Sequence, residues 1–170
     1  MRSNQDVVYL ELQGLHQWHV RLLLAVPPAA LIFITCRQVI LHVPWGPHPV
    51  SNGGLIFLTV LLLAVYFRLI TVKLETQLRR NGEIRVGLRG LWRRRRILIQ
   101  DIRRATPTVY DPVAEYGGYG IRSGPRGRAY IADGNQAVEV LLHNGSRILI
   151  GSQRPAELVR QIALQQGVTA

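Results

Sequence analysis

Four consecutive arginines form the densest charge in the sequence, between Leu91–Trp92 and the apolar run 97–99. A guanidinium binds phosphate through two parallel hydrogen bonds and does not lose its charge. Beside a membrane, each arginine could gain about 1 kcal/mol from anionic lipid headgroups. The run therefore contains our candidate contacts to lipid headgroups, which are Arg93, Arg94, Arg95 and Arg96.

Two other interpretations of this run remain open. Successive side chains of an extended segment point to opposite sides, so the run must lie on a sheet edge or in a loop rather than cross a core. A solvated loop whose charge only sets the orientation of a membrane segment would have the same composition. Nucleic-acid binding is not expected, because the apolar segments described below tether the domain and the strands show no array of stacking aromatics.

The whole chain is basic, with 21 basic and 10 acidic residues and a formal charge of +11. All basic residues except Lys73 are arginines. This composition favours a phosphate-rich neighbour, either lipid or nucleic acid. The single cysteine, Cys36, excludes an internal disulfide framework.

A glycine cluster at 117–120 has a superficial similarity to a phosphate-binding loop. No parallel βαβ pattern surrounds it, and the spacing to Gly124 does not fit a dinucleotide fingerprint. We interpret the cluster as a tight turn or bulge where backbones approach closely. Arg122 follows in a predicted strand and could pair with Glu115 or Asp133.

No convincing catalytic or metal-binding set emerges from the sequence. His16 and His19 have a spacing that suits two ligands on one helical face, but no third ligand accompanies them. His143 precedes a turn, and the other candidates are acidic residues scattered among turn signals: Asp101, Asp111, Glu115 and Asp133. We expect a protein that is not an enzyme and holds no cofactor or metal.

Residues 54–72 are the clearest structural element in the sequence. Ten of the first fourteen are Leu, Ile, Val or Phe, and at about −0.3 to −0.6 kcal/mol each they outweigh the cost of about +2.5 to +3.5 kcal/mol for one arginine at the centre. Arg68 lies near the end, where its long side chain can reach the headgroups. These features predict a transmembrane helix, with a buried helix of a soluble protein as the alternative.

Residues 22–41 form a second and weaker span, interrupted by Pro27–Pro28. Residues 42–53 are predicted to form an external loop. Residues 73–104, after the second span, contain eleven basic and three acidic residues. The positive-inside rule then places the N-terminal segment 1–21 and the domain 73–170 in the cytoplasm. The N-terminal segment has a weakly helical pattern in Val8, Leu12 and Leu15.

Three turn dipeptides indicate an antiparallel β domain after the second span. Asn81-Gly82 and Asn144-Gly145 each separate two strand-like runs, and Asp133-Gly134 opens the loop between RAYIA and AVEVLLH. Further strands are predicted at 95–99, 103–110 and 118–123. An amphipathic helix closes the chain, with Pro155 at its first position.

The segments EYGGYGIRSG and GNQAVEVLLHNGSRILIGSQRPAEL, after two apolar helices, resemble a family of small bacterial membrane proteins. Members of that family have a pleckstrin-homology-like domain of unsettled function. The similarity covers residues 73–166 best. It is carried by Gly117, Gly118, Gly120, Ile121, Arg122, Gly134, Gly145, Ile150, Gly151, Pro155 and Leu158.

The resemblance implies a two-helix transmembrane hairpin followed by about seven antiparallel strands in two near-orthogonal sheets, with a C-terminal helix. From the two apolar spans, the basic segment that follows them and the compact β pattern, we expect a non-enzymatic inner membrane protein whose cytoplasmic domain mediates protein interaction or assembly, with a protein partner or with its own copies. The alternatives are recognition of anionic lipid through the arginine run, or a role as an accessory subunit of a larger membrane complex. No activity and no lipid-binding motif follow from the resemblance.

Overall fold

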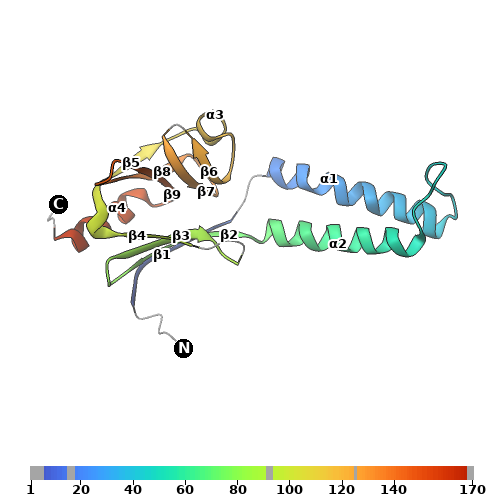
Figure 1. Ribbon diagram of the computed structural model, residues 1–170, viewed down its shortest axis with the longest axis horizontal. Helices are drawn as coiled ribbons and strands as arrows, with labels where there is room; N and C mark the ends of the chain where they lie inside the picture. The colour runs from blue at the N-terminus through green and yellow to red at the C-terminus, as the bar shows by residue number, and fades with distance from the viewer. Residues whose placement is uncertain (1–5, 15–17, 91–93, 125, 168–170) are drawn as a thin grey trace. The chain divides into compact units, whose positions relative to one another are not determined.

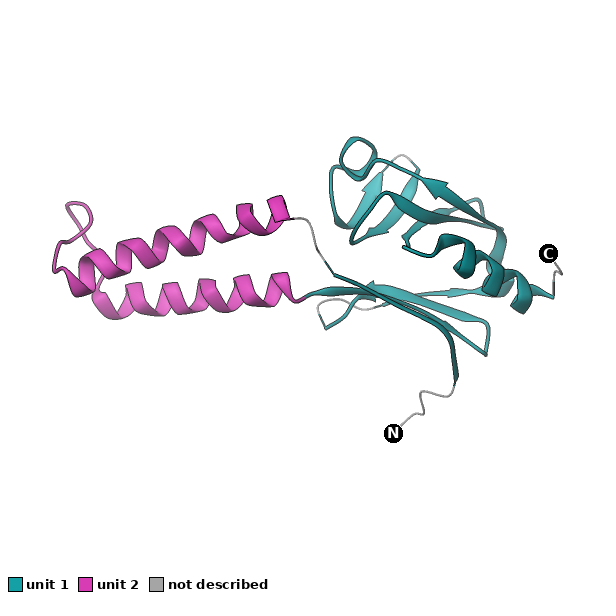
Figure 2. Ribbon diagram, turned by 180° about the vertical axis from the view of Figure 1, so that it is seen from behind, with its two compact units in different colours: residues 1–14, 72–170 teal, residues 15–71 magenta. Residues whose placement is uncertain are grey.

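The computed structural model of the chain describes residues 6–14, 18–90, 94–124 and 126–167. The chain forms two compact units, which are shown in different colours in Figure 2. Residues 15–71 make a helical unit, and residues 1–14 together with 72–170 make a β unit. The order of the elements can be followed in Figure 1.

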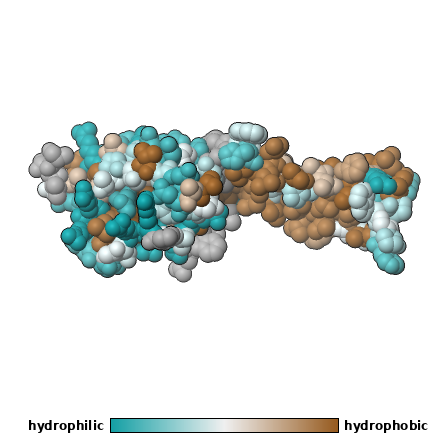
Figure 3. Space-filling model, turned by 90° about the horizontal axis from the view of Figure 1, so that it is seen from above, coloured by the Kyte–Doolittle hydropathy of each residue, from teal (hydrophilic) through white to brown (hydrophobic). Residues whose placement is uncertain are grey.

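The helical unit contains α1 (Trp18–Thr35), a π-helical turn η2 (Cys36–Ile40) and α2 (Asn52–Ile70). In the described part of the chain, Trp18–Ile40 and Asn52–Ile70 are both long and apolar enough to cross a membrane. Only 11% of the most apolar stretch of each helix is buried. A core helix of a soluble protein would be mostly buried, so this exposure argues against that alternative. Figure 3 shows hydrophobic residues covering the visible face of these helices.

Polar side chains connect the two helices. The hydroxyls of Thr35 and Thr59 lie 2.7 Å apart, and the Gln38 amide donates to the Val50 carbonyl at 2.6 Å and to Asn52 at 2.9 Å. Interhelical hydrogen bonds of this kind hold apolar helices together where hydrophobic burial supplies no driving force. The helical turn η2 extends the first span to Ile40, close to the predicted end at residue 41.

The β unit contains two sheets. The first has the order β1-β2-β3-β4, all antiparallel, with β1 (Val7–Gly14), β2 (Lys73–Arg79), β3 (Glu83–Leu88) and β4 (Arg95–Leu98). The second has the order β5-β8-β9-β7-β6. Its strands are β5 (Ile102–Val109), β6 (Gly120–Gly124), β7 (Gly127–Ile131), β8 (Gln136–Leu142) and β9 (Arg147–Gly151).

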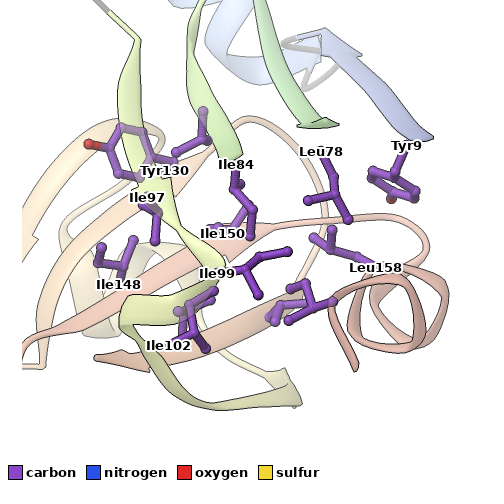
Figure 4. Packing of buried hydrophobic residues seen from close by; sticks show 14 of the residues in the cluster. Tyr9, Leu78, Ile84, Ile97, Ile99, Ile102, Tyr130, Ile148, Ile150 and Leu158 are labelled. Carbon is purple, nitrogen blue, oxygen red and sulfur yellow. The ribbon is translucent and has the colours of Figure 1, made fainter. Parts of the chain in front are cut away.

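One hydrophobic core lies between the two sheets. It takes alternate residues from the strands, because successive side chains of a strand point to opposite faces. Figure 4 shows these side chains turning toward one another, among them Leu78 and Ile84 from the first sheet and Ile150 from the second. The helix α4 (Pro155–Gln166) adds Leu158 and Ile162 to the same core, as the amphipathic pattern predicts.

The second sheet is apolar on its other face too. Ala129, Ile131, Ala137 and Leu149 pack there against Tyr110 and Tyr116. Tyr116 belongs to the short helix α3 (Pro112–Tyr116), which Asp111 caps by accepting from two backbone amides. The 3-10 turn η3 (Ile99–Asp101) connects the two sheets.

The structure corrects the prediction of a weakly helical N-terminal segment. Residues 7–14 form β1, which belongs to the β unit and pairs with β2 from Val7↔Arg79 to Gly14↔Lys73. The segment VYLELQ alternates between two faces, with Val8, Leu10 and Leu12 exposed and Tyr9, Glu11 and Gln13 buried. Its period of two is a strand signal, although the polar members are the buried ones.

The structure also corrects the strand pairing predicted around Asp133-Gly134. Strands β7 and β8 are not partners there: β7 pairs with β9 in parallel, and β8 lies between β5 and β9. The described residues therefore form nine strands rather than about seven, and one pair is parallel. The two Asn-Gly hairpins, β2–β3 and β8–β9, are confirmed.

Candidate functional site

The arginine run lies at the edge of the first sheet, as its charge density requires. Strand β4 begins at Arg95 and is hydrogen-bonded only to β3 in the sheet order. Ile97 is the buried residue of β4 and anchors the strand to the core. Arg93 lies outside the described residues.

Two of the arginines are held by buried carboxylates on the outer face of the first sheet. Arg94 Nη2 lies 2.5 Å from Glu75 Oε2, and Arg96 Nε lies 3.3 Å from Glu83 Oε1. The two carboxylate side chains are only 6% and 8% exposed. Glu83 also accepts from Arg85 at 2.7 Å, and this hydrogen bond, more than any other contact, lowers the pKa of Glu83. Arg94 and Arg96 therefore neutralise carboxylates of their own sheet.

Arg95 is separated from these pairs. It is exposed and lines a pocket of about 400 Å³ together with three arginines of the second sheet and its loops, namely Arg126, Arg128 and Arg147. The described part of the run therefore does not act as one cationic cluster. The sequence predicted the alternation of directions, but not the carboxylates that meet one side.

The glycine cluster forms a turn, as predicted, but backbones do not approach closely there, since a Cβ at Gly117 or Gly120 would meet no atom of the described residues within 4 Å. Gly117 ends α3 with a φ of 69°, and its amide donates to the Val113 carbonyl while that of Gly118 donates to Pro112. Gly118 and Gly120 also have positive φ values, of 122° and 104°, so side chains there would strain the backbone. No phosphate-binding helix follows: Gly120 begins strand β6.

Of the two partners predicted for Arg122, Glu115 is taken by another arginine. Arg122 Nε donates to the Tyr119 carbonyl at 2.9 Å, and Glu115 pairs instead with Arg126 at 2.7 Å. Gly145 has a φ of 81° in the β8–β9 turn, where Asn144 accepts from the Ser146 amide. The Gly151 carbonyl accepts from the Gln13 side chain at 2.9 Å.

A buried polar cluster was missed by the sequence analysis. Glu11 is 6% exposed, and its carboxylate accepts from Tyr9 at 2.5 Å, Gln13 at 2.9 Å, Ser152 at 2.7 Å and the Gln153 amide at 2.6 Å. Burial, assisted by the hydrogen bond to Glu11, raises the pKa of Tyr9. The cluster joins β1 to the segment between β9 and α4, so its hydrogen bonds hold together distant parts of the sequence.

Metal-ligating residues do not gather in the described part of the chain, where no three His, Cys, Asp or Glu residues could hold an ion together. His16 lies outside the described residues, and His19 belongs to α1. His143 donates its backbone amide to Asp101. Comparison with protein-family models gives no match, and comparison with curated proteins gives none either.

Proposed function

We propose that the protein is a non-enzymatic integral membrane protein whose two helices hold the β unit at the bilayer, where the β unit assembles with its own copies. The helices have the length and apolar surface for two crossings. The resemblance to bacterial proteins with a pleckstrin-homology-like domain supports the bacterial inner membrane as the location and this fold as the class of the β unit.

The pairing of β1 with β2 is the observation that most supports two membrane crossings. Gly14, just before the helical unit, pairs with Lys73, just after it. A segment whose two ends return to neighbouring positions in one sheet must begin and end on the same side of a membrane. Two crossings between Gly14 and Lys73 satisfy this requirement, whereas one crossing does not. The excess of arginine in residues 73–104 supports the cytoplasm as that side.

The free edge of β1 supports assembly. Val8, Leu10 and Leu12 are 39%, 43% and 42% exposed on one face of this edge strand. If two copies paired β1 antiparallel around Leu10, Leu10 would face its counterpart and Val8 would face Leu12, so the row is complementary to itself. The opposite edge, β4, carries exposed Arg95 and Arg96, which oppose such pairing. Arg154 donates to the Leu10 carbonyl at 3.3 Å and would be displaced on pairing.

The test is the mass of the full-length protein in a mild detergent, measured by light scattering over a range of concentrations. We expect a dimer for the wild type and a monomer for Leu10→Glu, because two like charges would then lie directly opposite each other on the paired strands. Val109→Glu is the matched control, since Val109 is 69% exposed on the edge strand β5 of the other sheet. A monomeric wild type, or a Leu10→Glu variant that stays dimeric, would contradict the proposal.

A further inference from the structure

The pocket beside Arg95 gathers cations from parts of the chain that are far apart in sequence. Arg95 comes from β4, Arg126 and Arg128 flank the start of β7, and Arg147 begins β9. The remaining lining residues are Gly127, Gly145, Ser146 and Ile148. Among the described residues the lining includes no carboxylate, and the pocket volume of about 400 Å³ lies in the usual range for small-ligand sites.

The fold fixes this convergence through the parallel pair of strands. Arg128 is the register partner of Ile148, so β7 and β9 start side by side. Gly127 has a φ of 102°, and a Cβ there would lie 2.1 Å from the Arg147 carbonyl oxygen. This close approach requires glycine at position 127, where the start of β7 lies against the start of β9.

The charges in the pocket are only half neutralised. Arg126 pairs with Glu115 at 2.7 Å, and Arg147 pairs with Glu139 at 3.5 Å. Among the residues that the structure describes, Arg95 and Arg128 have no carboxylate partner within 4.0 Å. The four arginines and two glutamates leave a charge of about +2, which is the complement of a phosphate monoester, whose charge is about −1.5 to −2 at pH 7.

We propose that this pocket binds a phosphate monoester dianion, with Arg95 and Arg128 as its principal ligands. The two guanidiniums approach from different sheets, so each can direct paired N–H donors at the phosphate oxygens. The Ser146 side chain in the same lining supplies a hydroxyl donor. Two sources share this chemistry, namely a lipid headgroup with a terminal phosphate and a soluble phosphate compound.

The experiment titrates the full-length protein in detergent micelles with three probes by calorimetry. The probes are inorganic phosphate, short-chain phosphatidic acid and short-chain phosphatidylglycerol, whose phosphodiester carries a single charge. We expect phosphatidic acid or inorganic phosphate to bind at least tenfold more tightly than phosphatidylglycerol. Tighter binding of phosphatidic acid than of inorganic phosphate identifies a lipid headgroup as the ligand, and equal or weaker binding identifies a soluble one.

Variants of single arginines locate the site. Arg128→Gln and Arg95→Gln should each weaken binding of the tighter probe about tenfold or more, since each removes a charge-assisted contact. Arg103→Gln is the control of equal charge: Arg103 is an exposed residue of β5 that lines a different pocket. Absence of binding by every probe would overturn the proposal. Equal losses in Arg128→Gln and Arg103→Gln, or equal affinity for all three probes, would do so too.

Discussion

Loss of the buried Glu11 carboxylate should destabilise the β unit by an amount that can be worked out from its contacts. Four donors converge on this carboxylate, three from side chains and one from the Gln153 backbone, at 2.5–2.9 Å. Replacing Glu11 by Ala removes the acceptor that these donors share. The Gln13 amide keeps its hydrogen bond to the Gly151 carbonyl, and the Tyr9 and Ser152 hydroxyls keep their contact with each other at 3.3 Å, but the Gln153 amide loses its acceptor. A buried donor that loses its acceptor costs about 1–3 kcal/mol, so the loss of several of these hydrogen bonds together should cost about 3–5 kcal/mol, a large part of the 5–15 kcal/mol that typically stabilises a domain.

The loss should appear first in β1, because Glu11 bonds this edge strand to Ser152 and Gln153. Amide hydrogen exchange of the full-length protein in micelles measures it directly. At about 1.4 kcal/mol per factor of ten, a loss of about 3–5 kcal/mol accelerates exchange in β1 by about two to four orders of magnitude. Glu11→Gln keeps one acceptor oxygen and should have a smaller effect.

The control for this experiment is Glu157→Gln. Glu157 is 44% exposed and pairs with Arg154 at 3.0 Å on the surface of α4, and an exposed pair contributes about 0.2–1 kcal/mol. Its effect on β1 exchange should stay below about sixfold. If the exchange rates of the β1 amides in Glu11→Ala stay within a few-fold of wild type, the hydrogen bonds of Glu11 do not hold β1 in the β unit, and the reasoning is refuted.

Three further predictions concern the β unit. Joining Gly14 to Val72 with a loop of about four residues should give a water-soluble domain that unfolds cooperatively, because Gly14 and Lys73 are register partners. Residues 73–170 alone lack β1 and should unfold at a lower urea concentration, which urea melts of the two proteins measure. In the same assay, Gly127→Ala should destabilise the domain by about 1–3 kcal/mol, because the added Cβ would lie 2.1 Å from the Arg147 carbonyl oxygen. A variant as stable as the wild type would contradict this close contact. Glu83 has a lowered pKa in the folded state, so its ion pairs stabilise the fold above the ordinary pKa of 4.5 and lose that effect as the pH falls through the lowered pKa. The difference in unfolding free energy between wild type and Glu83→Gln should therefore be largest at pH 7 and smaller at pH 3. A difference that does not change with pH would refute this account.

The sequence predicted the elements whose signals are local. A stretch of nineteen residues rich in Leu, Ile, Val and Phe marks α2, and Asn-Gly between alternating runs marks the β2–β3 and β8–β9 hairpins. Pro155 and the stripe through Leu158 and Ile162 mark α4. In each case, the residues that form the element also contain the physical reason for it.

The errors arose where distant segments decide the structure. Glu11 and Gln13 can face inward because Ser152 and the Gly151 carbonyl meet them, and no local pattern indicates these partners. For the same reason, β7 pairs in parallel with β9 instead of forming a hairpin with β8. The arginine run indicated its edge position, but the distant residues Glu75 and Glu83 determine which of its arginines are paired with carboxylates.

Sided labelling of single cysteines tests the membrane hairpin most directly. In a Cys36→Ser background, Val8→Cys and Ser123→Cys report on the β unit, and His48→Cys reports on the loop between α1 and α2; all three native residues are exposed. With a membrane-impermeant maleimide on intact cells, we predict labelling at His48→Cys only, with Val8→Cys and Ser123→Cys reacting after permeabilisation. Equal labelling of all three sites before permeabilisation, or labelling of Val8→Cys and Ser123→Cys from opposite sides, would contradict the hairpin.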